Sequence, residues 1–224
     1  MIPGFIINAL TFPGMIAHEA VNELLLKSSG TKVTDSCYFR FSADAAEPNS
    51  YIEHELPNKY STSLLVNIGP LLVNSALALL SALAIKINDD SPAKLVFMWL
   101  TLSFAMHAFP SFSEARMLMS KSAKSIKKNI LAVLGLILSP LFFVIGILKI
   151  FWLDLLYGIM LVDVINTKVV SAFLLSLPSS VVRIFPFTLL ILLLAVVIMN
   201  REKISRPAII IFSIAVAAGC FWSI

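Results

Sequence analysis

Apolar runs that are long enough to cross a lipid bilayer recur along the chain, with short polar segments between them. A membrane-spanning helix needs about 20 mostly apolar residues. The runs that approach or exceed this length are residues 2–26, 62–86, 94–112, 129–165, 181–199 and 207–223. This pattern predicts an all-α polytopic membrane protein with about five to six transmembrane helices.

Two of these runs contain residues that interrupt a helix. In the second run, Gly69 and Pro70 are expected to break the first half of the helix. The run 129–165 is too long for one span, because a helix rises only about 1.5 Å per residue. We expect Pro140 and the polar Asp154 and Asp163 to divide it into a spanning part and an interfacial or re-entrant part. Whether residues 150–180 cross the bilayer stays open.

The polar segment 27–61 carries a different pattern. Two stretches, "VTDSCYFRFS" and "SYIEHEL", are typical of short strands, and turn-forming residues lie between them. The segment therefore predicts a small cytoplasmic β-hairpin over residues 33–57, between the first two transmembrane helices. An exposed strand edge there could pair with an extended segment of a substrate or a partner protein.

Composition agrees with a membrane protein that has no separate soluble domain. Hydrophobic residues make up 58% of the 224 residues and charged residues only 13%, whereas soluble domains average about 25% charged residues. The two cysteines, Cys37 and Cys220, form no disulfide framework and no metal motif. The net charge of +4 comes from basic residues in short loops. Basic loops of this kind set the orientation of a membrane protein, so we do not expect a nucleic acid partner.

These loops also predict an orientation in the cell's inner membrane. The basic segments 116–128 and 201–206 are expected in the cytoplasm, and the acidic turn 87–92 outside. The hairpin is then cytoplasmic, and the N-terminus lies outside if the first segment crosses fully. The lysines of 121–128 are expected to contact anionic lipid headgroups. A homo-oligomer and a membrane-protein substrate or partner subunit both remain open.

Candidate chemistry begins in the first apolar run, at "HEAVN". It resembles the zinc motif H-E-x-x-H, in which two histidines one helical turn apart bind the ion and the glutamate polarises a water molecule. His18 and Glu19 hold the first two places, and Asn22 stands where the second histidine belongs. We therefore consider His18 and Asn22 as metal ligands and Glu19 as the catalytic base. Zinc, the expected cofactor, lowers the pKa of its water to about 7.

Further polar residues lie inside or beside the other runs. Asn74 and His107 lie within predicted spans, and Glu114 follows the break at Pro110. Glu114 could supply a carboxylate to a metal held by His18, or it could simply cap a helix. Asn74 and His107 are candidate substrate-binding residues, or they form interhelical hydrogen bonds. His54, in the predicted hairpin, is a third candidate for substrate binding. His54 and the adjacent Glu55 are not expected to bind one metal ion together, because adjacent residues of a strand point to opposite faces of the sheet.

The order of these features resembles the site-2 protease class of intramembrane zinc metalloproteases. More specifically, it resembles small prokaryotic membrane proteins of metalloprotease-like sequence, over roughly residues 1–120. The motifs that carry the resemblance are Pro13-Gly14 with His18-Glu19, "VTDSCYFRF" (33–41), "YIEHELP" (51–57), "GPLLVNS" (69–75) and "MHAFPS" (106–111).

The resemblance implies a metalloprotease-like membrane core over residues 1–128 and additional transmembrane helices over 129–224. It implies that His18 is a zinc ligand and that Glu19 is the catalytic glutamate. Members usually have histidine at the position of Asn22 and aspartate at that of Glu114, so both ligand positions depart here. Because losing an imidazole weakens zinc binding by orders of magnitude, two functions remain open. One is an intramembrane peptidase; the other is a catalytically degenerate relative that acts as a membrane sensor, scaffold or channel subunit.

Overall fold

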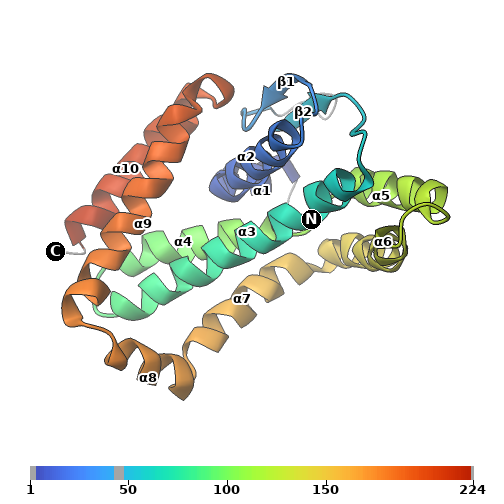
Figure 1. Ribbon diagram of the computed structural model, residues 1–224. Helices are drawn as coiled ribbons and strands as arrows, with labels where there is room; N and C mark the ends of the chain where they lie inside the picture. Colours follow the sequence, from blue (N-terminus) through green and yellow to red (C-terminus); the bar gives the residue numbers. More distant parts are fainter. Residues whose placement is uncertain (1–3, 43–47, 223–224) are drawn as a thin grey trace.

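The computed structural model describes residues 4–42 and 48–222, which form a mostly helical molecule with one small hairpin (Figure 1). The elements in chain order are α1 (Gly4–Leu10), α2 (Phe12–Ser28), β1 (Val33–Cys37), β2 (Tyr51–His54), α3 (Tyr60–Ile87), α4 (Ala93–Met106), α5 (Phe112–Ser125), α6 (Leu131–Leu148), η1 (Lys149–Phe151), α7 (Leu153–Ile165), α8 (Lys168–Ser176), α9 (Ser179–Met199), η2 (Arg201–Lys203) and α10 (Arg206–Trp222).

Helices α3 and α4 pack side by side at the centre of the molecule, and the other elements pack around this pair (Figure 1). Helix α2 packs on both of them from the side that carries the hairpin, and α7 packs on both as well. Helix α10 packs on α4 and α9 on α3. Aromatic side chains fill the centre: the Phe12 ring lies 5.3 Å from Phe39 and 6.3 Å from Phe212 between ring centroids. Residues from both ends of the chain therefore share one core.

Within the described residues, three helices are long and apolar enough to cross a membrane: α3, α6 and α9. Helices α4 and α10 are apolar but shorter. Large apolar side chains also point outward from these helices; Ile137, Leu192 and Ile214 are each about 60% exposed. Such outward apolar surface suits a lipid environment, because in water it would be an unfavourable exposed patch.

Three sequence expectations about these helices were wrong in detail. The first run is not one helix, because the chain bends at Thr11 between α1 and α2. Helix α3 continues through Pro70, which is fully buried; tertiary packing outweighs the hydrogen bond that proline cannot donate. The run 129–165 divides at residues 149–152 and not at Pro140, because Trp152 adopts the left-handed conformation (φ 62°) and ends the helical path.

The predicted hairpin is confirmed, with shorter strands than the sequence suggested. Strand β1 pairs antiparallel with β2, from Val33 opposite His54 to Cys37 opposite Tyr51. Part of the predicted turn, residues 43–47, lies outside the described residues. The chain after β1 pairs with the turn between α9 and α10: the Tyr38 N–H donates to the Lys203 carbonyl, and the Ser205 N–H donates to the Phe39 carbonyl. The hairpin is thus fixed to the C-terminal helices.

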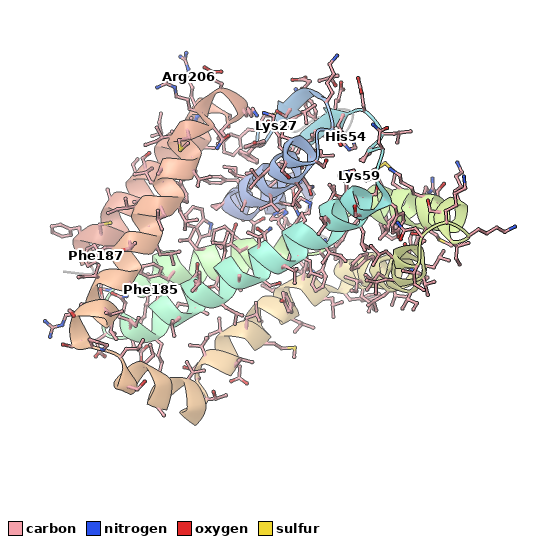
Figure 2. The ribbon with its side chains drawn as sticks, in the orientation of Figure 1. Lys27, His54, Lys59, Phe185, Phe187 and Arg206 are labelled. Carbon is pink, nitrogen blue, oxygen red and sulfur yellow. The ribbon has the colours of Figure 1, made fainter. Side chains whose placement is uncertain are left out.

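A buried carboxylate supports this connection. Glu23 of α2 is 3% exposed and pairs with Lys203 and with Lys27, the latter at 2.6 Å. The Lys203 ammonium also lies over the Tyr38 ring, 4.9 Å from its centroid. In Figure 2, Lys27, His54, Lys59 and Arg206 all lie along the same edge of the molecule. The basic turn after α9 and the hairpin therefore share one end of the structure.

We expect Gly14→Ala to destabilise the protein by about 2 kcal/mol or more, because a Cβ there would lie 2.0 Å from the Ser103 backbone oxygen. The matched control is Gly219→Ala, whose Cβ would meet the movable end of Leu190 at 2.9 Å. Thermal unfolding in detergent measures both. Equal melting temperatures for the two variants would contradict the close packing of α2 on α4.

Replacing Lys203 with methionine is expected to destabilise the fold by roughly 1–2 kcal/mol, because the buried Glu23 then keeps Lys27 as its one cationic partner among the described residues. Lys94→Met is the control, since Lys94 pairs with the exposed Asp89 at 3.9 Å and should change stability by less than about 0.5 kcal/mol. Denaturant or thermal unfolding compares them. A Lys203 variant as stable as the Lys94 variant would show that the pair contributes nothing.

Candidate functional site

A cavity of about 870 Å³ opens between α2, β2 and the start of α5. It contains nearly all the site residues that the sequence singled out. Those that line it are His18, Glu19, Asn22, His54, His107 and Glu114. Asn74 is fully buried and lies behind the wall of the cavity. Residues of the first apolar run therefore meet His107 of the third run and Glu114 just after it, about 90 positions later in the sequence.

The ring of His18 is fixed in a defined orientation. Its Nδ1 lies 2.8 Å from the His107 carbonyl oxygen, which can only accept, so Nδ1 carries the proton. Its Nε2 lies 3.4 Å from Glu114 Oε1. Histidine ligands of metals usually donate their other ring N–H to a carbonyl or carboxylate in this way. The carbonyl of His107 thus leaves Nε2 directed at the carboxylate.

The two carboxylate oxygens of Glu114 have different partners: one bonds to the start of α5, and the other faces the cavity. Its Oε2 accepts hydrogen bonds from the Ser111 N–H at 2.7 Å and from the Ser111 hydroxyl at 2.8 Å. The Glu114 backbone N–H donates to Ser111 Oγ at 3.3 Å, which completes a capping box at the start of α5. Its Oε1 faces His18 and Asn22. Burial by itself would raise the pKa of this carboxyl, but a hydrogen bond from a doubly protonated His18 and those from Ser111 outweigh it and lower the pKa to about 2.

Asn22 completes the group. Its Nδ2 donates to Glu114 Oε1 at 3.2 Å, and among the described residues its buried Oδ1 has no hydrogen-bond partner. The two ends of an asparagine amide are interchangeable in shape, so their placement follows from the partners assumed. With the amide rotated, Asn22 Oδ1 and an unprotonated His18 Nε2 would both be acceptors that approach Glu114 Oε1, itself an acceptor. A cation would satisfy all three at once.

These three groups are chemically suited to bind a divalent metal ion. An imidazole nitrogen, a carboxylate oxygen and an amide oxygen are all known ligands, although nitrogen and sulfur ligands dominate zinc sites. Within residues 4–42 and 48–222, no three His, Cys, Asp or Glu side chains gather in a way that could hold a metal. The candidate site thus depends on the amide of Asn22 as a ligand. A proton on His18 Nε2 would also satisfy the contact with Glu114, with no metal.

Glu19 lies beside this group and is positioned by the hairpin. Its Oε1 accepts a hydrogen bond from the Ser50 hydroxyl at 2.7 Å. Both Glu19 and Ser50 line the cavity. A carboxylate placed next to a polarised water molecule is the usual form of a general base. Ser50 was not singled out in the sequence, since a serine in a turn carries no distinctive signal.

Asn74 and His107 form interhelical hydrogen bonds, which was one of the two predicted alternatives. Asn74 Nδ2 donates to the His107 carbonyl at 2.8 Å and to the Gly14 carbonyl at 3.1 Å. The His107 ring lines the cavity, and its Nε2 lies 2.8 Å from the Thr11 hydroxyl. Asn74 therefore supports the His18 position from behind.

His54 lines the cavity from the end of β2, and Figure 2 shows it at the edge of the molecule that also carries Lys27 and Lys59. Its Nδ1 hydrogen-bonds to the Glu55 carbonyl at 2.7 Å. Lys149, which also lines the cavity, was not singled out in the sequence. A single lysine after an apolar run is typical of a helix end and gives no signal of a site.

Comparisons of the chain with models of known protein families, with curated proteins and with solved structures give no match. The contacts of the cavity residues are therefore the basis for assigning a function.

Asn74→Ala is expected to weaken binding of added Zn²⁺ by about tenfold or more, because second-shell partners of metal ligands contribute that much and the His107 carbonyl would lose one of its two side-chain donors. The control is Asn67→Ala on the same helix, where, among the described residues, Asn67 Nδ2 bonds to the Ser63 carbonyl alone. Zinc titration of the purified variants measures the difference. Equal affinities for the two variants would rule out a supporting role for Asn74.

Proposed function

We propose that this chain is a multi-pass protein of the cell's inner membrane that acts as an intramembrane zinc metallopeptidase of the site-2-protease-like kind. It would hydrolyse a peptide bond of a membrane-protein substrate near the cytoplasmic face. The supporting features are the candidate spans, the cavity with its donor group, and the hairpin beside it.

The orientation proposed for the membrane is consistent with the fold. The basic turn 201–206 and the hairpin lie at one end of the molecule, where Lys203 pairs with Glu23. Positively charged loops stay predominantly in the cytoplasm. The cavity adjoins the hairpin, so we place it near the cytoplasmic face.

One observation carries the proposal: the His18 imidazole, with Nδ1 fixed by a carbonyl, directs Nε2 at Glu114 Oε1 while Asn22 approaches the same oxygen. Ionisable groups inside a membrane segment are costly and usually mark a functional site. His18, Asn22 and Glu114 would hold the zinc ion.

The residues around the cavity suit peptide hydrolysis. When bound, zinc would polarise the substrate carbonyl and make water more acidic. Glu19 would take a proton from the water molecule as its oxygen joins the carbonyl carbon. As the carbon–nitrogen bond breaks, Glu19 would give this proton to the leaving nitrogen. The hydrogen bond from Ser50 to Glu19 Oε1 at 2.7 Å would orient the carboxylate for both transfers.

The hairpin offers a place for the substrate. In the described sheet, β1 lies on one side of β2 only, and residues 50–56 line the cavity. An extended peptide could add to the open edge of β2 through backbone hydrogen bonds. Such a strand would run along the cavity wall that holds Glu19 and Ser50. A substrate helix would have to unwind locally to bind in this way.

A second function is favoured by a different contact. The Asn22 amide donates to Glu114 Oε1, and a protonated His18 would donate to the same oxygen. The group is then complete without an ion. On this alternative the chain is a catalytically degenerate relative, a membrane sensor, scaffold or channel subunit that works with protein partners.

Metal analysis of the purified protein separates the two functions. The peptidase should bind about one zinc per chain, and His18→Ala should lose it. Asn22→His, which supplies a second imidazole one turn after His18, should bind zinc about tenfold or more tightly than the natural chain. His54→Ala is the control, because the His54 ring bonds to the Glu55 carbonyl and not to the proposed ligands, and it should keep wild-type zinc content. No zinc at saturating metal in the natural chain would support the degenerate alternative.

Glu19→Gln should keep the zinc and lose at least about a hundredfold in cleavage of a co-expressed membrane substrate, because the amide cannot take a proton from water. The measurement pairs zinc content with gel analysis of the substrate. Undiminished cleavage in this variant would exclude Glu19 as the base.

A further inference from the structure

Lys149 brings a positive charge into the cavity from the C-terminal half of the chain. It begins η1, directly after the apolar helix α6, and lines the same cavity as His18, Glu19 and Glu114. Its Nζ donates to the Phe109 carbonyl at 3.2 Å. Of the residues described around this cavity, Lys149 is the one lysine or arginine in the lining.

The ammonium group of Lys149 has more N–H groups than hydrogen-bond partners among the described residues. It carries three N–H groups, and within residues 4–42 and 48–222 the Phe109 carbonyl is its one hydrogen-bond partner. No described carboxylate lies within ion-pair distance of it; the charges of Asp154 and Glu114 act on it from farther away. Asp154 Oδ1 instead accepts the Leu155 N–H at 2.9 Å. A partly buried cation with free donors favours an anionic ligand.

The backbone beside Lys149 holds an unfavourable conformation. Trp152 has φ 62° and ψ 31°, the left-handed region, and it is the one non-glycine residue with positive φ among those described. Such a conformation costs about 1–2 kcal/mol for a residue with a Cβ, and strained residues cluster at functional sites. This turn ends η1 and starts α7, so it fixes where the chain bends beside Lys149.

We infer that Lys149 is the anion-binding residue of the cavity and binds the carbonyl oxygen of the bound peptide. This inference rests on the proposed peptidase function. As the oxygen of water joins the carbonyl carbon, the carbon–oxygen double bond opens and its electron pair moves to the carbonyl oxygen, which becomes negative. An ammonium beside that oxygen stabilises this charge, and it does so more strongly in a cavity than in water. The substrate class is a peptide bound with a carbonyl directed at Lys149.

The test uses the full-length chain in detergent and two capped apolar tripeptides. One has a phosphinic group in place of an amide bond, and therefore a tetrahedral anionic centre. The other has a neutral hydroxyethylene group at the same position. Isothermal titration calorimetry gives both affinities for the natural chain, Lys149→Met, Lys149→Arg and the control Lys94→Met. Zinc content is measured on the same samples, and each titration is repeated after the metal has been removed.

The natural chain should bind the phosphinic peptide more tightly than the neutral one. Lys149→Met should lose about tenfold or more for the phosphinic peptide and less than about twofold for the neutral one, since a hydrogen bond to a charged group contributes that much. Lys149→Arg should keep most of the preference, and Lys94→Met all of it. Equal losses for the two peptides, or no preference in the natural chain, would overturn the inference and leave Lys149 as an anchor for the Phe109 carbonyl.

This experiment distinguishes a failure of the peptidase proposal from a failure of the inference about Lys149. A natural chain without zinc contradicts the peptidase, while a Lys149-dependent phosphinic preference in metal-free protein still supports the anion site. Zinc retained in Lys149→Met with an unchanged phosphinic preference contradicts the role of Lys149 alone.

Discussion

The carbonyl of His107 is the point on which the site depends. It lies just past the end of α4, where a helix leaves backbone carbonyls without partners, and such groups are costly to bury away from water. Two side chains satisfy it: His18 Nδ1 from α2 and Asn74 Nδ2 from α3, both at 2.8 Å. One backbone oxygen therefore joins three helices and at the same time sets the tautomer of the imidazole.

The other polar residues of the cavity are held in a similar way. Glu114 caps α5 with one oxygen and faces His18 with the other. Glu19 is tied to the hairpin through Ser50, so the strand next to which a substrate would bind also orients the proposed base. Each group is held by a bond that the fold requires, and its remaining capacity is directed into the cavity. Such preorganisation is what a catalytic site needs, and it would equally serve a metal-free sensor.

The apolar runs and the hairpin could be predicted because both follow from local patterns. The meeting of His18, Asn22 and Glu114 was inferred from a motif and a resemblance. The division of the run 129–165 was predicted, but its position at residues 149–152 was not, since that position depends on a tryptophan in the left-handed conformation, which is rare for residues other than glycine. Lys149 was missed for a related reason: its place in the cavity follows from that turn. The pairing of Lys203 with Glu23 joins residues 180 positions apart, which no local pattern can specify.

X-ray absorption at the zinc edge of the zinc-loaded protein tests the central idea most directly, that one imidazole and oxygen donors share a single ion. We expect ligands at about 2.0–2.2 Å with scattering from one imidazole, which disappears in His18→Ala. A spectrum with two imidazoles should appear in Asn22→His. Sulfur scattering, or a spectrum that His18→Ala leaves unchanged, would place the ion elsewhere and contradict the account.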